Sequence, residues 1–404
     1  MLDGIRILDL SEEPGFLAGK ILGDLGADVI KLEPPGGDTF GRRGPFLGEL
    51  ADPERSLRWL ALNTSKRGIT LALATPRGGE LFRRLAARAD VVLETAAPGS
   101  LEALGLGWET LHAERPGLVW CSLTPFGRTG PYAQFRAHDL VLVAMGGNAA
   151  LTGDPDRAPV RCTLPTAYYA AGPEAAAGIA MALYARARSG RGQLVDVSMQ
   201  ECQLATLVTA PGQYSLSPKR RGRTGARLGG TREIWRAKDG DVSFGLRGGA
   251  ARVPSLVATV AWMAEEGMAP EWLRALDWKT YNHNLLSVQE IARLEDAFTS
   301  FFATKTRREL FEQALARRIM LAPCNDAREI LEQPQLRSRG LFTTLDYPEL
   351  GARIEHPDFF AKASRSRIGI RRRAPRVGEH NAEVYGELEI DAEALRELAS
   401  QGVV

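Results

Sequence analysis

Cysteine is scarce in this chain of 404 residues, which has only four: Cys121, Cys162, Cys202 and Cys324. They stand far apart and form no Cys-x-x-Cys pair, which argues against a zinc site and against a disulfide framework. We therefore expect four buried, reduced thiols and no bound metal. Cys162 is the one cysteine that we single out for a test of reactivity.

Long apolar runs and an excess of one charge are missing as well. No stretch approaches the roughly 20 apolar residues of a membrane span, and the sequence enters a strand pattern directly after residue 4, which predicts no signal peptide. The 51 basic residues are nearly balanced by 49 acidic ones, so nothing favours a nucleic-acid partner. We expect a cytoplasmic protein with neither a membrane nor a nucleic-acid partner.

A nicotinamide-binding fingerprint is also absent, since no G-x-G-x-x-G follows the first predicted strand. What the first two hundred residues do contain is an alternation of short β-rich runs with helical spacing, which is typical of βα units. The predicted strands are residues 5–10, 28–32, 69–73, 91–94, 118–123 and 194–197. The pattern predicts an α/β fold with a doubly wound, mostly parallel sheet of the Rossmann-like kind.

Two domains follow from the change of pattern along the chain. We expect a large α/β domain over residues 1–203, completed by 365–404, and a small α+β domain over 231–330, with a linker at 204–230 and a return linker at 331–364. The small domain should contain a hairpin at 234–244 and helices near 254–266, 289–303 and 307–316. In the large domain, the Ala-rich stretch 164–188 predicts a long helix that begins near Tyr168 or Gly172.

Several longer motifs identify a family. They are LDGIRILDL at residues 2–10, LGDLGADVIKLEPPGGD at 22–38, NTSKRGITL at 63–71, RSGRGQLVDVSM at 188–199 and VGEHNAEVYGEL at 377–388. Together they make the chain resemble the class III CoA-transferases, a group that includes carnitine and formyl-CoA transferases and α-methylacyl-CoA racemase. The resemblance implies a coenzyme A thioester and a carboxylic acid as substrates, no permanently bound cofactor, and a dimer of interlocked chains.

One position departs from the family pattern. Relatives read P-x-A-D at the start of the long helix, with the aspartate as nucleophile, whereas this chain reads Pro165-Thr166-Ala167-Tyr168. The resemblance implies that the aspartate forms an anhydride with the acyl group and then a thioester with CoA, and both steps need a carboxyl group. A phenol with an ordinary pKa of about 10 can do neither. Tyr168 therefore occupies the nucleophile position without the nucleophile's chemistry.

The racemase branch uses a histidine and an aspartate as paired acid and base. His138 matches its histidine, but the partner aspartate falls at Tyr168, so only half of the pair is present. Asp139 matches an acidic position near the family's active site, where it would orient substrate or polarise the reacting carboxyl. Alternatively, Asp139 caps a helix over residues 140–145, and His138 is a structural or surface histidine.

The resemblance also implies ligand-binding positions. Those for CoA are Leu71, Ala74, Thr95, Ala96, Leu104, Arg136 and Met199. Relatives often carry cations at the positions of Ala74 and Ala103, which are uncharged here, so we expect an altered grip on CoA. Residues 245–251, with Gly245, Gly248 and Gly249, match a glycine-rich loop that closes over substrate, although a plain strand-to-helix turn also uses glycine.

Two functional hypotheses remain. In the first, the chain is the non-catalytic subunit of a heteromeric CoA-transferase, as in the benzylsuccinate type of the family, where one of two related subunits lacks the nucleophile. In the second, it is a self-sufficient CoA-transferase or racemase-like enzyme, a homodimer that uses His138, Asp139 or Tyr168 in altered roles. We favour the first, because losing a covalent nucleophile removes the reaction pathway, which tighter binding cannot restore.

Overall fold

The structure is a computed structural model that describes residues 1–38, 41–216 and 222–404. The chain forms two compact units. The large unit comprises Met1–Ala149, Arg161–Arg220 and Gln335–Val404, and the small unit comprises Ala150–Val160 and Arg221–Pro334. Among the described residues, none of the helices has both the length and the apolar character that crossing a bilayer requires.

The large unit is built on a six-stranded sheet in which every neighbouring pair is parallel. Its strands are β1 (Arg6–Asp9), β2 (Asp28–Glu33), β3 (Lys66–Thr70), β4 (Val91–Glu94), β5 (Val119–Thr124) and β6 (Leu194–Ser198). They lie in the order β3-β2-β1-β4-β5-β6. The parallel sheet predicted from the sequence is confirmed. Strand order reverses between β1 and β4, which marks the crevice where open α/β sheets bind their ligands.

The third strand lies three residues earlier than its apolar residues indicate, because it begins with two buried cations. Lys66 is fully buried and pairs with Asp9 at 2.8 Å. Arg67 pairs with Asp28 at 2.6 Å. These ion pairs let charged side chains enter the sheet, where a search for apolar runs does not expect them.

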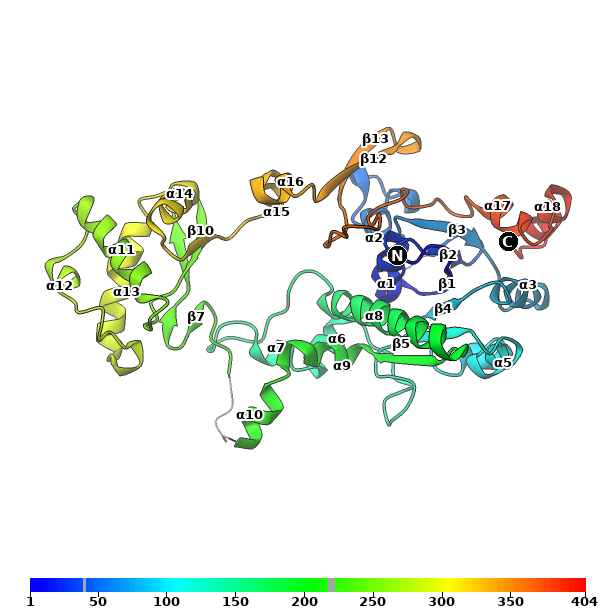
Figure 1. Cartoon of the computed structure of the whole chain (residues 1–404), viewed down its shortest axis with the longest axis horizontal. Coiled ribbons are helices and arrows are strands. Elements are labelled where there is room, and N and C mark those ends of the chain that lie inside the picture. The colour runs from blue at the N-terminus through cyan, green and yellow to red at the C-terminus, as the bar shows by residue number, and fades with distance from the viewer. Residues whose placement is uncertain (39–40, 217–221) are drawn as a thin grey trace. The chain divides into compact units, whose positions relative to one another are not determined.

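Helices cover both faces of this sheet, because successive strand residues point to opposite sides (Figure 1). One face packs against α1 (Glu13–Asp24), α6 (Asp139–Met145), α8 (Thr166–Ser189) and α9 (Met199–Leu204). The other packs against α3 (Pro76–Ala86), α5 (Trp108–Glu114), α17 (Asn381–Gly386) and α18 (Ala392–Ser400). The Ala-rich helix predicted near Tyr168 is therefore α8, and it begins at Thr166.

Helices α1 and α8 lie side by side, and glycine allows their close approach (Figure 1). A Cβ atom at Gly172 would stand 3.0 Å from the Leu17 Cβ and 3.3 Å from the Ala18 nitrogen. A Cβ at Gly15 would stand 2.4 Å from the Cβ of Ser11. A larger side chain at Gly172 would force α1 and α8 apart, and one at Gly15 would displace the turn at Ser11 that precedes α1. The start of α8, which carries Tyr168, is thus held against the start of α1.

The end of the chain completes the large unit by bonding to residues 59–72. The Trp59 indole donates to the Pro375 carbonyl at 2.8 Å, and the Tyr385 hydroxyl donates to the Thr70 carbonyl at 2.6 Å. The Ala72 amide donates to the carbonyl of Val403 at 2.8 Å. These bonds join stretches that lie far apart in sequence.

Two stretches expected to be linkers contain regular structure. Residues 331–364 hold α16 (Pro334–Ser338) and an antiparallel hairpin of β12 (Phe342–Tyr347) and β13 (Ala352–Pro357), which corrects their assignment as a return linker. The hairpin forms because its turn places Gly351 at a φ of 60° and its buried Tyr347 packs with Phe16 and Trp59. The stretch 204–230 contains α10 (Ala210–Leu216), and its residues 217–221 lie outside the described residues.

The small unit packs helices on a three-stranded antiparallel sheet. The strands are β9 (Ile234–Ala237), β10 (Gly240–Phe244) and β11 (Leu321–Pro323), and the main helices are α11 (Val253–Glu265), α13 (Val288–Phe302) and α14 (Arg307–Arg317). The aromatic side chains of Trp235, Phe244, Phe298 and Phe302 contact one another in its core.

The remaining short α-helices and β-strands come from both units. They are α2 (Leu57–Leu62), α4 (Ser100–Ala103), α7 (Asn148–Leu151), α12 (Glu271–Arg274), α15 (Ala327–Glu332), β7 (Arg227–Leu228) and β8 (Thr231–Arg232).

Candidate functional site

Tyr168 is the third residue of α8, and its side chain is tied to Asp139. The Tyr168 hydroxyl accepts a hydrogen bond of 3.1 Å from the Asp139 amide. In return, the Asp139 carboxylate accepts one of 2.9 Å from the Ala167 amide, in the first turn of α8. The two residues therefore fix each other at the point where relatives carry the nucleophile.

This pair corrects the expected structural role of Asp139 as the cap of the helix that follows it. Helix α6 begins at Asp139 itself, and its cap position is His138, whose side chain makes no capping bond. The Asp139 carboxylate instead satisfies an amide of α8, a helix far along the chain. The predicted cap is therefore wrong, because sequence alone does not show which helix end stands opposite a carboxylate.

Burial disfavours the charged form of both Tyr168 and Asp139. Burial raises the pKa of the Tyr168 phenol, and the hydrogen bond from Asp139 offsets only part of that rise. Burial also raises the pKa of the Asp139 carboxyl, against the opposing effects of the Ala167 amide and Arg161. Tyr168 is thus uncharged at neutral pH and offers no phenolate as a nucleophile.

A cleft of about 340 Å³ opens beside Tyr168. It is lined by Glu13, Arg43, Arg58, His138, Asp139, Leu140, Arg161, Thr163, Pro165 and Tyr168. His138, Asp139 and Tyr168, the three catalytic candidates from the sequence, are therefore brought together. The cleft also contains charged residues that the sequence analysis did not single out.

The most buried of these is Glu13, the first residue of α1, whose side chain is 6% exposed. One of its carboxylate oxygens pairs with Arg43 and the other with Arg58, each at 2.6 Å. An acid followed by Pro14 at a helix start was a readable signal. Arg43 and Arg58 showed no such signal in the sequence, because they come from separate segments that only the fold brings together.

Buried charges fix the turn that precedes Glu13. Asp9, at the end of β1, accepts bonds from the Lys66 ammonium at 2.8 Å and from the Ser11 amide at 3.0 Å. Lys31 donates to the Ser11 carbonyl. Burial alone would raise the pKa of Asp9, but Lys66 and Lys31 outweigh it and lower that pKa. The turn that leads into α1 is thus anchored on ion pairs inside the sheet.

Two of the expected CoA positions lie at the topological switch point. Thr95 follows β4, and its hydroxyl accepts a 2.8 Å bond from the Glu12 amide, which follows β1. The Ala96 amide donates to the carboxylate of Glu94 at 2.6 Å. Burial raises the pKa of that carboxyl. This placement is where a doubly wound sheet receives a ligand.

The other CoA candidates are dispersed. Leu71 and Met199 are buried in core clusters on opposite faces of the sheet. Ala74, Leu104 and Arg136 are exposed on the connections after β3, β4 and β5.

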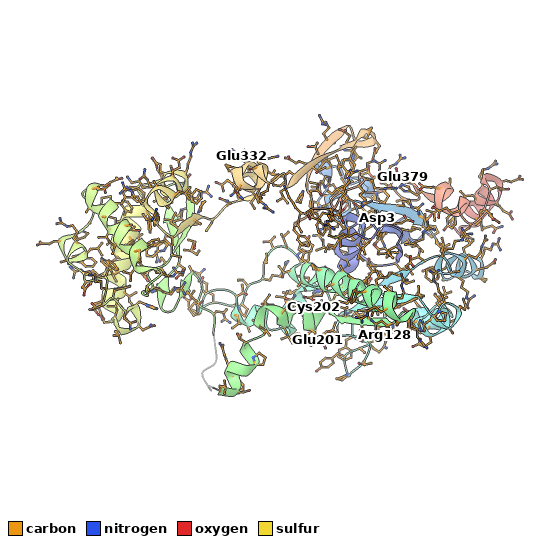
Figure 2. The ribbon with its side chains drawn as sticks, viewed as in Figure 1. Asp3, Arg128, Glu201, Cys202, Glu332 and Glu379 are labelled. Atoms are coloured by element: carbon orange, nitrogen blue, oxygen red, sulfur yellow. The ribbon has the colours of Figure 1, made fainter. Side chains whose placement is uncertain are left out.

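The connection after β5 is tied to α4. Arg128 pairs with Glu102 at 2.7 Å, and Figure 2 labels Arg128 on the segment after β5. The Gln134 amide donates to the Pro98 carbonyl at 3.3 Å. The stretch that includes Arg136 therefore stays close to the segment after β4.

The glycine-rich loop at residues 245–251 joins β10 to α11 in the small unit. Gly249 has a φ of 110° with open space where a Cβ would stand, whereas a Cβ at Gly248 would lie 2.5 Å from the Tyr281 carbonyl oxygen. A Cβ at Gly245 would meet Arg252 at 2.1 Å. The backbone therefore requires glycine at 248 and 249, whichever of the two roles the loop has, whereas at Gly245 only movable side chains stand in the way.

Two features of the site concern metals and thiols. Among the described residues, no group of three or more His, Cys, Asp or Glu side chains could hold a metal ion. Cys121 and Cys202 are buried, the latter on α9 (Figure 2), but Cys162 and Cys324 are exposed. The expectation of four buried thiols is therefore wrong for two of them, since both follow or precede regular elements instead of lying inside one.

The thiols should separate cleanly by labelling rate. Iodoacetamide at pH 8 should alkylate Cys162 and Cys324 quickly, and Cys121 and Cys202 only after unfolding, because burial raises the pKa of both, that of Cys202 to about 11. Peptide mass spectrometry over time measures all four. Rapid native labelling of Cys121 would contradict the packing of β5.

Known proteins match this chain over nearly its whole length. Residues 2–381 match CoA-transferase family III. The chain is 34% identical over 401 residues to the succinyl-CoA:(R)-benzylsuccinate CoA-transferase subunit BbsE of Thauera aromatica, covering 99% of this chain and 97% of that one. It is 34% identical over 422 residues to a formyl-CoA:oxalate CoA-transferase of Streptomyces avermitilis, covering 100% and 99%.

A solved structure is similar over the same length. The crystal structure of a CAIB/BAIF family protein from Brucella suis superimposes with a TM-score of 0.82 at 29% identity, covering 96% of this chain and 99% of that one. The family match, the relatives and this structure each extend over nearly the whole chain. The chain therefore belongs to CoA-transferase family III.

Proposed function

We propose that this chain is the non-catalytic subunit of a heteromeric CoA-transferase that acts on acyl-CoA thioesters and carboxylic acids. The observation that carries the proposal is Tyr168, a neutral phenol at the start of α8 where the family pattern has its nucleophilic aspartate. The subunit's partner is a related chain that keeps this aspartate. CoA binds near Thr95 and Ala96, at the crevice between β1 and β4.

The chemistry of transfer explains why the substitution is decisive. A carboxylate oxygen must attack the thioester carbonyl, which breaks the carbon–sulfur bond and leaves an anhydride and a CoA thiolate. The thiolate then attacks the enzyme's side of the anhydride and releases the acyl group as a free acid. An ester on the Tyr168 oxygen offers no carbonyl of the enzyme's own to the thiolate, so the chain cannot carry CoA there.

The two other carboxylates of the cleft are engaged elsewhere. The Asp139 carboxylate accepts a hydrogen bond from the Ala167 amide, and the two carboxylate oxygens of Glu13 pair with Arg43 and Arg58. Hydrogen bonds and ion pairs to a carboxylate stabilise its charge and reduce its tendency to attack. Neither is therefore positioned to replace the missing aspartate.

The relatives suggest the class of acid. Succinate, benzylsuccinate and oxalate, which appear in the names of the two relatives above, are all dicarboxylic acids. One relative is moreover named as a subunit. We extend both properties to this chain: a dicarboxylic acid as substrate, and a second, related subunit. We further propose that the two chains interlock as a dimer.

The proposal predicts CoA binding without a covalent adduct. Incubation of the isolated protein with succinyl-CoA should leave its intact mass unchanged, and hydroxylamine should trap no hydroxamate, because no side chain can hold both acyl group and CoA. An aspartate-bearing relative treated in parallel provides the positive control. An acyl or CoA adduct on any residue of this chain would sink the proposal and support a self-sufficient enzyme that works through His138 or Asp139.

A further inference from the structure

We propose that the cleft beside Tyr168 binds a free organic carboxylate non-covalently, held by Arg43 and Arg58. The inference rests on the proposed function, since it assigns a ligand to the cleft that has lost its nucleophile. The proposed ligand is a small acid with at least one ionised carboxylate.

The geometry of Glu13 prepares the two arginines for a ligand. One nitrogen of each guanidinium bonds to the buried Glu13 carboxylate, at 2.6 Å in both cases. Among the contacts of the described residues, Glu13 is the only partner of each guanidinium. A guanidinium has five N–H donors in a planar fork, so each keeps donors for a second carboxylate.

The arginines are held in place and are still accessible. The Arg43 side chain is 54% exposed and that of Arg58 is 35% exposed, whereas the Glu13 carboxylate beneath them is almost completely buried. The turn that precedes Glu13 is fixed by the hydrogen bonds that Ser11 makes with Asp9 and Lys31. Arginines fixed in this way lose little conformational entropy when a ligand binds.

The charge of the cleft favours one added anion. Arg43, Arg58 and Arg161 outnumber the two carboxylates of Glu13 and Asp139, which leaves a net positive charge. An aspartate in place of Tyr168 would have cancelled it. The exchange of a carboxylate for a neutral phenol therefore turns a balanced site into one that attracts an anion.

The lining also favours a carboxylic acid over a bare inorganic anion. Leu140, Pro165 and the Tyr168 ring lie beside the arginines and offer apolar contact to a short hydrocarbon chain. The volume of about 340 Å³ suits a small acid and is at the lower end of the size of ligand pockets. A planar carboxylate also matches the fork of a guanidinium.

Calorimetric titration of the full-length chain with succinate, at constant ionic strength and without CoA, tests the inference. We expect saturable binding at one site per chain. Arg43→Gln and Arg58→Gln should each weaken it about tenfold or more, because each removes charge-assisted hydrogen bonds. Arg77→Gln, which removes an exposed arginine paired with Glu80 on α3, is the matched control and should leave binding unchanged. Tyr168→Asp should weaken binding severalfold by restoring the negative charge.

Three results would overturn the inference: no saturable binding of succinate, an equal loss in the Arg77→Gln control, or inorganic phosphate binding as tightly as succinate. The outcome is separate from that of the adduct experiment. Succinate binding together with a covalent adduct would refute the non-catalytic role alone. A missing adduct together with missing succinate binding would refute the carboxylate site alone.

Discussion

Replacing Tyr168 with aspartate should give this chain a covalent chemistry that it lacks, taking adduct formation with succinyl-CoA from undetectable to measurable. The new carboxylate would stand in the first turn of α8, a helix of 24 residues whose positive end stabilises an anion. Arg43, Arg58 and Arg161 supply further positive charge in the same cleft. Intact-mass analysis, with hydroxylamine trapping to locate the modified peptide, measures the gain.

The gain has a limit that the structure sets. Removing the phenol leaves the Asp139 amide without its hydrogen bond of 3.1 Å, and two carboxyl groups then share one end of α8. Like charges at this spacing raise the pKa of one of the pair, so the adduct should form faster as the pH rises from 5 to 8. We expect a rate below that of natural aspartate-bearing relatives.

Tyr169→Asp is the matched control, because Tyr169 is the next residue on the same helix and burial raises the pKa of its phenol too. A step of one residue turns a side chain by about 100° around the helix axis, so this carboxylate should form no adduct. Adducts on both variants would mean that any acid near the cleft is acylated. A folded Tyr168→Asp variant without an adduct would mean that the cleft has changed in more than its nucleophile.

Co-expression with an aspartate-bearing relative should yield a mixed assembly that transfers CoA faster than either chain alone. The physical reason is that each proposed active site needs the partner's carboxylate together with a loop supplied by a small unit, and this chain keeps its own loop at 245–251. Size-exclusion chromatography with mass spectrometry identifies the assembly, and CoA transfer from succinyl-CoA measures its activity. Sorting into homodimers, or full activity of this chain alone, would refute the partner hypothesis.

Glycine substitutions distinguish the loop's role in turnover from a role in folding. Gly249→Val should lower CoA transfer by the mixed assembly more than it lowers formation of that assembly. A β-branched residue is strained at a φ of 110°, although nothing lies within 4 Å to clash with it. Gly248→Val is a less specific test, since its Cβ would clash with the Tyr281 carbonyl oxygen. Gly230→Val, at a φ of 83° and also in open space, is the control in the same unit and should spare turnover.

The sheet could be predicted because five of its six strands carry apolar residues where the structure has them. The exception is β3, which begins three residues earlier than predicted because Lys66 and Arg67 are buried by partners that only the fold supplies. The site divides in the same way. Tyr168 and Asp139 were found through a motif, whereas Arg43 and Arg58 were missed because no local pattern marks a surface arginine that will meet Glu13.

The large unit is assembled from three separate stretches of the chain, and this has a consequence for its synthesis. The Trp59 indole donates to the carbonyl of Pro375, which is synthesised 316 residues later. The small unit lies within residues 150–334, between these two positions. At ribosomal speeds of about 5–20 residues per second, that interval lasts roughly 15–60 seconds. The small unit can finish folding on the nascent chain during this time. The large unit, whose six sheet strands are all made by residue 198, is therefore completed last. Until then the face of the sheet that α17 and α18 cover is open to chaperones or to another nascent chain.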